Sequence, residues 1–354
     1  MTKALSEKEF GEKFDGLRQT WDSCLRGAEG IIRTILASAN VEILDITSRI
    51  KTVESAYQKY ISKSKNYADP FSQITDFIGI RVTVYLERDI QKVEEAIRSS
   101  LDVDAANSID KTKELSIDRM GYRSKHLICS LGASREILPE YGIAASQRFE
   151  VQIRSALQHT WAEIEHRKRY KSLHSLPDDL QRRLNIISGT LELLDREFSD
   201  IVSKVEEYQE AVRESKSSLQ NDPLTEIAAT QLLIDRLGVG KGSTKEDFRY
   251  DWYRDVAIGE LKKFGIETIE DFENLLKNDR VLQSQSYIVG SRGQTFIGTV
   301  RDIMMIADLR KYFEDAYPGN YILMESEAEY LEDIYGAEET RKILDDAGVQ
   351  VLGD

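Results

Sequence analysis

Residues 150–171 carry the densest group of side chains in this chain that could perform chemistry. Glu150, Gln152 and Arg154 alternate with apolar residues, so a strand would place all three on one face. A helix-like run follows and adds imidazole and carboxylate groups. Burying so many polar and charged groups costs free energy. We therefore predict that this stretch contributes to an active site.

The helix-like run also offers a competing, metal-binding chemistry. His159, Glu163 and His166 fall on one face of a helix, at neighbouring turns, and could act as metal ligands. Zinc hydrolases use a His-Glu-x-x-His spacing, which is absent, and neither Cys24 nor Cys129 lies nearby. We therefore favour a polar pocket over a zinc site.

Composition and charge restrict the class of protein. The 354 residues suffice for two or three domains, and the contents of 41% hydrophobic and 31% charged residues are those of a globular protein. No apolar run approaches the ~20 residues that span a bilayer. The N-terminus lacks the apolar core of a signal peptide, and two cysteines provide no disulfide framework. We expect a cytoplasmic protein without a membrane partner.

The net charge of −14 is unevenly distributed. Residues 222–354 hold 15 basic and 27 acidic residues, a balance of −12, whereas residues 118–183 hold 12 basic and 8 acidic residues. A locally positive site on an acidic protein favours a phosphorylated ligand. The acidic remainder disfavours broad, non-specific binding of nucleic acid.

The elements that must position these residues follow from hydrophobic periodicity. Helices are predicted at about 9–39, 51–64 and 89–100, and strands at 41–50, 78–86, 126–131 and 148–154. A turn is predicted at 66–70 and a loop from 101 to about 113. This order predicts an α+β domain, a mixed sheet of about five strands flanked by helices.

The rest of the chain is predicted to be mainly helical. Helical spacing from 176 to about 219 predicts one or two long helices, which leave room for a subunit interface in a homo-oligomer. Further helices are predicted at 226–237, 245–264, 269–276 and 299–316, with a short strand pair around 287–297. We place the domain limits at 1–175, 176–221 and 222–354, where Asn221-Asp222-Pro223 breaks the helical pattern.

Five segments in fixed order give the chain a family resemblance. They are Ser48-Arg49-Ile50-Lys51-Thr52, Asp76-Phe77-Ile78-Gly79-Ile80-Arg81, Gly121-Tyr122-Arg123-Ser124-Lys125-His126, Glu150-Val151-Gln152-Ile153-Arg154, and Trp161-Ala162-Glu163-Ile164-Glu165-His166 with Tyr170-Lys171. With these segments the chain resembles the synthetase domain of the RelA/SpoT family, which makes the alarmones ppGpp and pppGpp. The small alarmone synthetases are most similar. The resemblance covers about residues 41–171 and implies a nucleotidyltransferase-like fold.

The resemblance implies an ATP-dependent pyrophosphokinase that transfers the β,γ-pyrophosphate of ATP to the 3′-hydroxyl of GDP or GTP. This chemistry needs cations on the triphosphate, a carboxylate-held Mg²⁺ and a base near the hydroxyl. By the family pattern, Arg49, Lys51 and Arg81 bind ATP, and Asp76 and Glu150 are the catalytic residues and the ligands of Mg²⁺.

For the acceptor nucleotide, the resemblance implies a second group of residues. Tyr122 corresponds to the tyrosine that stacks on the acceptor base, and Arg123, His126 and Gln152 would surround its ribose and phosphates. One departure falls here, because Asp118 stands where the family usually has a lysine.

Two alternatives follow from this departure and from the long acidic C-terminal region. One is a toxic relative, of toxin–antitoxin or phage-defence systems, that pyrophosphorylates the 3′ end of tRNA or makes an adenosine alarmone. Its RNA contact would be Arg167, Lys168 and Arg169, although such a run is also typical of a solvated helix end. The other is a non-catalytic nucleotide-binding regulator. In each case residues 222–354 would be regulatory or bind a protein partner.

Overall fold

The computed structural model describes residues 5–62, 67–110, 124–167, 177–239, 253–290, 295–319 and 322–353. These residues form two compact units, Met1–Val202 and Ser203–Asp354. The boundary between the units falls inside one helix, whereas the sequence placed domain limits at 175/176 and 221/222. Each unit has its own hydrophobic core and is described by itself.

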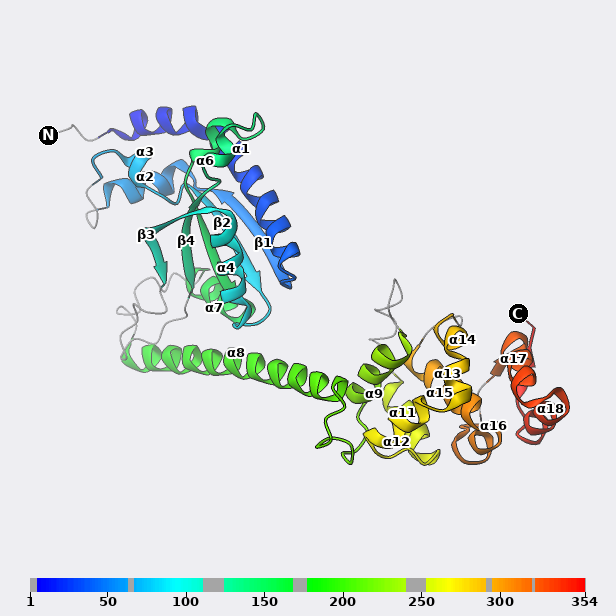
Figure 1. Cartoon of the computed structure of the whole chain (residues 1–354). Helices are drawn as coiled ribbons and strands as arrows, with labels where there is room; N and C mark the ends of the chain where they lie inside the picture. The colour runs from blue at the N-terminus through cyan, green and yellow to red at the C-terminus, as the bar shows by residue number, and fades with distance from the viewer. Residues whose placement is uncertain are drawn as a thin grey trace. The chain divides into compact units, whose positions relative to one another are not determined.

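The first unit is an α+β domain (Figure 1). Its elements are α1 (Glu7–Ser38), β1 (Ile43–Ile50), α2 (Val53–Ile61), α3 (Pro70–Gln73), β2 (Ile78–Val84), α4 (Asp89–Ser100), β3 (Asp102–Asp110), β4 (Lys125–Ser130), α6 (Ala133–Glu136), η1 (Gly142–Ser146), β5 (Phe149–Ser155), α7 (Ala156–Arg167) and α8 (Asp178–Arg213). The predicted fold class and four predicted strands are confirmed.

The five strands form one mixed sheet in the order β1-β2-β5-β4-β3. Only the central pair, β2 and β5, is parallel, with Gly79 opposite Glu150 and Arg81 opposite Gln152. The other pairs are antiparallel. This pairing brings together two strands that lie about 70 residues apart in the sequence.

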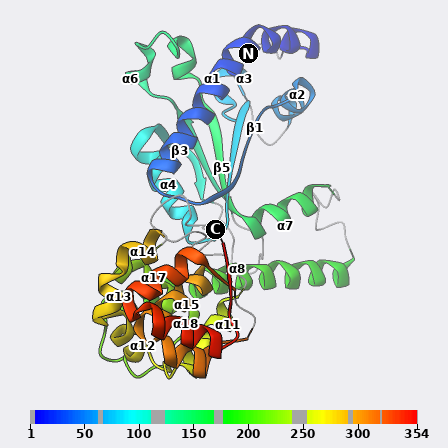
Figure 2. The same ribbon diagram turned by 90° about the vertical axis from the view of Figure 1, so that its right-hand side faces the viewer.

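Alternation along the strands gives the sheet one apolar face and one polar face. Ile80, Val82, Val151 and Ile153 are fully buried on the apolar face, in the core that contains residues of α1 and α4. Figures 1 and 2 show α1 lying along the sheet. The residues between them in sequence therefore point to the opposite face, where α7 contacts β2 and β5.

Local sequence features explain where helix α1 begins and which of its faces is buried. Ser6 caps it, because its side chain accepts from the Glu9 amide while Glu9 accepts from the Ser6 amide in return. Its buried residues recur at helical spacing and are Phe10, Phe14, Trp21, Cys24, Ala28, Ile32 and Leu36. This stripe packs against the sheet and holds the apolar face away from water.

The second unit is mainly helical. Its elements, after the C-terminal end of α8, are α9 (Glu226–Leu232), the π-helical turn η3 (Leu233–Leu237), α11 (Arg254–Lys263), α12 (Ile269–Leu276), α13 (Asp279–Gln283), α14 (Gln285–Gly290), α15 (Phe296–Ala307), α16 (Leu309–Lys311), the π-helical turn η4 (Tyr312–Ala316), β6 (Ile322–Met324), α17 (Glu325–Tyr335), α18 (Ala337–Asp346) and β7 (Gln350–Leu352). Strands β6 and β7 pair in parallel. In the parts of the chain that the structure describes, no helix is both long and apolar enough to cross a bilayer.

The loop predicted from residue 101 to about 113 was wrong over its described part. Residues Asp102–Asp110 form β3, an edge strand paired with β4. Its Asp, Asn and Ser residues have low strand propensity, so no strand was predicted here. Pairing with β4 overrides that propensity, and the register shifts between Asp104 and Ile109, where Asp104 accepts from the amides of Ala106 and Asn107.

The strand pair predicted around residues 287–297 was also wrong in the described residues. Helices α14 and α15 occupy this region, apart from residues 291–294. Thr295 caps α15 by accepting from the Gly298 amide, and Phe296, Val300 and Ile303 are fully buried at helical spacing. Aromatic and β-branched residues favour strands on average, but here burial against the helical core decides the structure.

The carboxylate of Glu273 on α12 provides a stability test for the second unit. It is 4% exposed and accepts from Ser215, from Arg236 at 3.0 Å and from Lys277 at 3.4 Å. Burial opposes ionisation of Glu273, but these hydrogen bonds and charges outweigh it and lower its pKa. Its stabilising effect is therefore present above the ordinary carboxyl pKa of about 4 and is lost as the pH falls through the folded pKa.

We expect Glu273→Gln to lower the free energy of unfolding at pH 7 by about 1–3 kcal/mol. In urea unfolding, the difference from the wild type should shrink as the pH is lowered toward about 3. Glu270→Gln, an exposed carboxylate on the same helix, is the control and should have little effect. A difference that stays constant with pH would contradict this role.

Candidate active site

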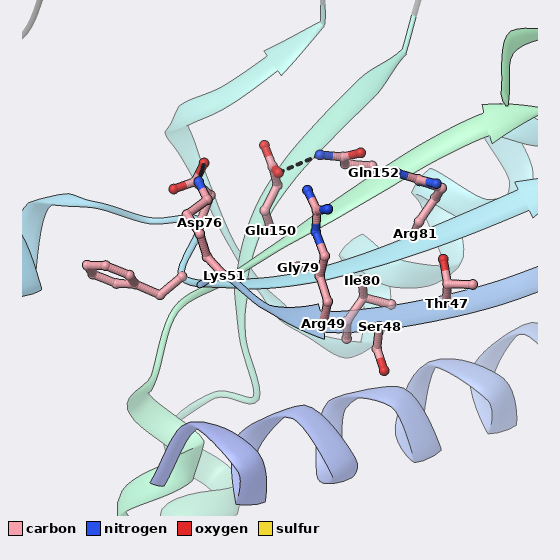
Figure 3. A pocket seen from close by; sticks show the side chains of 11 residues that line it. Thr47, Ser48, Arg49, Lys51, Asp76, Gly79, Ile80, Arg81, Glu150 and Gln152 are labelled. Atoms are coloured by element: carbon pink, nitrogen blue, oxygen red, sulfur yellow. Dashed lines mark hydrogen bonds and ion pairs between the residues drawn. The ribbon is translucent and has the colours of Figure 1, made fainter. Parts of the chain in front are cut away.

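Six of the predicted site residues line one pocket of about 120 Å³ on the polar face of the sheet. They are Arg49, Lys51, Asp76, Arg81, Glu150 and Gln152. Figure 3 shows Asp76 and Glu150 pointing to the same side of the sheet, with the guanidinium group of Arg49 near Glu150. Two carboxylates from separate segments therefore share one cavity with several cations.

Alternation at the end of β1 explains which side chains enter this pocket. Arg49 projects into it, whereas the neighbouring Ser48 points to α1, where its hydroxyl donates to Glu29 at 2.6 Å (Figure 3). The backbone amide of Lys51 donates to the Phe77 carbonyl at 2.8 Å. This bond continues the pairing of β1 with β2 and sets Lys51 beside the loop that carries Asp76.

The position of Asp76 depends on the residue that follows it. Phe77 is 4% exposed and its ring stacks on Trp21 of α1, with centroids 4.8 Å apart, and on Phe71 of α3 at 5.7 Å. A large buried aromatic ring fixes the backbone on either side of it. The carboxylate of Asp76 is thereby held at the start of β2, facing the pocket.

Two lysines bind the Asp76 carboxylate. The ammonium groups of Lys51 and Lys59 each donate to Oδ2 of Asp76 at 2.7 Å. Burial opposes ionisation of Asp76, but the two hydrogen bonds and the two positive charges outweigh it, so its pKa lies below the usual value. Asp76 is therefore ionised at neutral pH.

Glu150 lies in a hydrogen-bonded network between β4 and β5. His126 Nδ1 lies 2.7 Å from its Oε1, and Gln152 Nε2 donates to its Oε2 at 2.7 Å. Burial raises the pKa of Glu150, and the nearby Asp76 charge acts in the same direction. The hydrogen bonds from His126 and Gln152 outweigh both, so the pKa of Glu150 is lowered overall.

Arg81 is held from the other side by α7. Its Nη1 donates to Glu163 Oε1 at 3.0 Å and lies 3.5 Å from His159 Nδ1. Burial, and then the Arg81 charge, lower the pKa of His159. His159 and Glu163 therefore contact the guanidinium group of Arg81. Arg81 lies at the rim of the pocket, opposite Gln152 on β5.

The donor set of the pocket fits a hard divalent cation. Oδ1 of Asp76 is buried and has no hydrogen-bond partner among the described residues, whereas Oδ2 binds both lysines. An unpaired buried carboxylate oxygen is costly unless a ligand satisfies it. Carboxylate oxygens are the ligands that Mg²⁺ prefers, and Asp76 lies close enough to Glu150 for its charge to act on the pKa of Glu150. Asp76 and Glu150 would hold the ion.

Several predicted residues lie outside the described part of the chain. They are Tyr122, Arg123, Lys168 and Arg169, together with the side chains of His166 and Arg167. Their roles in acceptor or RNA binding stay predictions. Of the acceptor group, His126 and Gln152 are described, and both bind Glu150.

Lys59 and Glu163 bind pocket residues, although the family resemblance gave neither of them a role in the nucleotide site. Lys59 looks like an exposed lysine of an amphipathic helix, but α2, which Thr52 caps at its start, brings it to Asp76. Glu163 had been grouped with histidines as a metal ligand, yet its partner is Arg81. An excess of positive charge near Asp76 in the sequence could have suggested Lys59 as its partner. The distance between Lys59 and Asp76 depends on the fold and could not be predicted from the sequence.

An open sheet face with two carboxylates among four cations is suited to a phosphorylated ligand.

The family model for the region found in RelA/SpoT proteins matches residues 48–175 of this sequence. GTP pyrophosphokinase YjbM of Bacillus subtilis (strain 168) is 32% identical over 181 residues, 49% of this chain and 80% of YjbM. GTP pyrophosphokinase YwaC of the same organism is 27% identical over 161 residues, 45% of this chain and 73% of YwaC.

Among solved structures, small alarmone synthetase 1 from Bacillus subtilis has a TM-score of 0.46 and 25% identity, with 55% of this chain and 99% of that chain covered. The family match contains the pocket residues from Arg49 to Gln152 and also Glu163, the partner of Arg81. The chain belongs to the RelA/SpoT family of alarmone synthetases. Residues 176–354 lie beyond the matched family region.

Proposed function

We propose that this protein is an ATP-dependent pyrophosphokinase that makes (p)ppGpp from GDP or GTP and releases AMP. The two relatives YjbM and YwaC are named GTP pyrophosphokinases, which supports this reaction class. The observation that carries the proposal is the shared pocket, in which Asp76 and Glu150 lie among Arg49, Lys51 and Arg81. Each of these groups has a task in pyrophosphate transfer.

The cations would bind and orient the triphosphate of ATP. Lys51 and Lys59 form one positive cluster at Asp76, and Arg49 and Arg81 form a second group along the sheet. Positive groups fixed before the reaction stabilise the negative charge that develops on the phosphates during transfer. Glu163 keeps the Arg81 guanidinium directed along this face.

Glu150 would accept the proton of the acceptor hydroxyl. The 3′-oxygen then forms a bond to the β-phosphorus of ATP, the bond from that phosphorus to the α,β-bridging oxygen breaks, and AMP leaves. The lowered pKa of Glu150 keeps it ionised at neutral pH and ready to accept a hydrogen bond from the hydroxyl. By orienting the hydroxyl, this carboxylate would accelerate transfer through geometry as well as through its basicity.

We further propose that Asp76 and Glu150 hold Mg²⁺, with Oδ1 of Asp76 as the available ligand atom. A bound Mg²⁺ would neutralise phosphate charge and polarise the β-phosphorus toward attack. The lysines at Oδ2 keep the Asp76 carboxylate ionised, so its Oδ1 would bind the ion as an anionic ligand.

Acceptor specificity is tested by a transfer assay. The full chain is incubated with Mg²⁺ and ATP labelled in its γ-phosphate, together with GDP, GTP, unlabelled ATP or deacylated tRNA. We expect label to move to GDP or GTP, with one AMP released for each labelled product. Reactions without an acceptor measure hydrolysis of ATP and serve as the control.

The other outcomes are equally informative. Label found only on tRNA or only on an adenosine product would replace the guanosine acceptor with the toxic-relative alternative. Release of ADP in place of AMP, or nucleotide binding with no AMP, would contradict pyrophosphate transfer. The proposal that residues 222–354 bind a protein partner or regulate activity needs a separate test, namely the same assay with and without candidate partners.

A further inference from the structure

A hydrogen-bonded chain links Ser124, His126 and Glu150 behind the pocket. The Ser124 hydroxyl lies 2.7 Å from His126 Nε2, and His126 Nδ1 lies 2.7 Å from Glu150 Oε1. Ser124 and His126 are 7% and 8% exposed. Both nitrogens of the imidazole ring are therefore engaged within the protein, and little of the ring is left for a ligand to reach.

The strand geometry explains this alignment. Ser124 precedes β4 and lies two residues before His126, so both side chains project from the same face of the sheet. His126 pairs with Gln152 across the antiparallel strands, and Glu150 is the diagonal neighbour on that face. Leu127, the residue after His126, is 3% exposed and belongs to the apolar core on the opposite face of the sheet.

The donors and acceptors among Ser124, His126 and Glu150 permit one tautomer for a neutral imidazole ring. An ionised carboxylate only accepts hydrogen bonds, so His126 Nδ1 must carry the proton that it donates to Glu150. Nε2 is then an acceptor and needs a donor, which the Ser124 hydroxyl supplies. The opposite tautomer would direct the Nδ1 lone pair at the carboxylate and leave two acceptors facing each other.

We propose that Ser124 and His126 are positioning residues that fix the orientation of the Glu150 carboxylate for attack by the acceptor hydroxyl. This inference rests on the proposed function of Glu150. It assigns His126 a role through Glu150, where the family resemblance implied a direct contact with the acceptor. Gln152 donates to the other carboxylate oxygen, and Glu150 lines the pocket.

The test combines kinetics with NMR of the full chain. Ser124→Ala removes the donor to Nε2, and we expect it to lower kcat about 10-fold, with the KM values for ATP and acceptor within about 2-fold of the wild type. Ser124→Thr keeps the hydroxyl and should recover most of the lost kcat. Ser130→Ala removes a hydroxyl from the other end of the same strand and controls for the loss of a serine.

NMR correlation of the ring nitrogens with the ring protons reports the tautomer directly, and His126 can be assigned by substitution because the chain has only four histidines. We expect the Nδ1-protonated form in the wild type and in Ser124→Thr, and a mixture of tautomers in Ser124→Ala. Melting curves of all variants check that each one is folded. The NMR measurement needs no catalytic turnover.

Three outcomes would overturn the inference. They are an Nε2-protonated His126 in the wild type, an unchanged kcat in folded Ser124→Ala, and a raised KM for the acceptor with unchanged kcat. The last result would return His126 to acceptor binding. If the wild type transfers no pyrophosphate, the proposed function fails and the catalytic role of the pair fails with it, whereas the tautomer result still shows whether Ser124 orients His126.

Discussion

Replacing Asp76 with asparagine is expected to reduce pyrophosphate transfer by a factor of about 10³ or more. The substitution keeps the shape of the side chain but removes the charge that Lys51 and Lys59 share and the oxygen available to a cation. Two ammonium groups would then repel each other and any bound cation. The measurement is the initial rate of AMP release, together with binding of Mg²⁺–ATP by calorimetry, which should weaken.

The fold should survive this change. Asp76 is 18% exposed at its side chain, and the stacking of Phe77 on Trp21 that fixes the loop does not involve the carboxylate. A thermal melt should therefore still show a cooperative transition. Asp45→Asn, an exposed carboxylate on β1 outside the pocket, is the matched control and should retain activity. Near-normal transfer by Asp76→Asn would refute the assignment of this residue.

Replacing Glu150 with glutamine should lower kcat by about 10²–10⁴-fold while binding of ATP is preserved. An amide cannot accept the proton of the acceptor hydroxyl at neutral pH. Its NH₂ group would also face a donor, either His126 or Gln152, so one of the two hydrogen bonds is lost. Single-turnover measurements with saturating ATP and acceptor isolate the chemical step.

The two substitutions are expected to differ in their effect on nucleotide binding. Asp76→Asn should weaken binding of the metal–nucleotide complex and transfer together, whereas Glu150→Gln should impair transfer with little change in nucleotide binding. Glu140→Gln, at an exposed glutamate outside the pocket, controls for the loss of a carboxylate. If Glu150→Gln retains kcat and only raises the KM for the acceptor, Glu150 binds the substrate and is not the base.

Local sequence patterns predicted some elements of this protein, whereas elements that depend on distant partners were predicted wrongly. Alternation predicted β2 and β5, and helical spacing predicted α1, α4 and α12, because each pattern is local and matches the period of its element. β3 was missed, since its polar residues carry no such pattern and its strand conformation depends on pairing with β4. The strand pair predicted around 287–297 failed for the converse reason, as residues with strand propensity pack into a helical core.

The sequence by itself determined the residue types of the site, their order and their membership of two polar strand faces. The tertiary structure decided which of these side chains share a cavity. The parallel pairing of Gly79 with Glu150 brings the Asp76 loop beside β5, and helices α2 and α7 then add Lys59 and Glu163. Strand pairing and helix packing join residues that are distant in sequence, so their partners depend on the folded backbone and cannot be read from spacing along the chain.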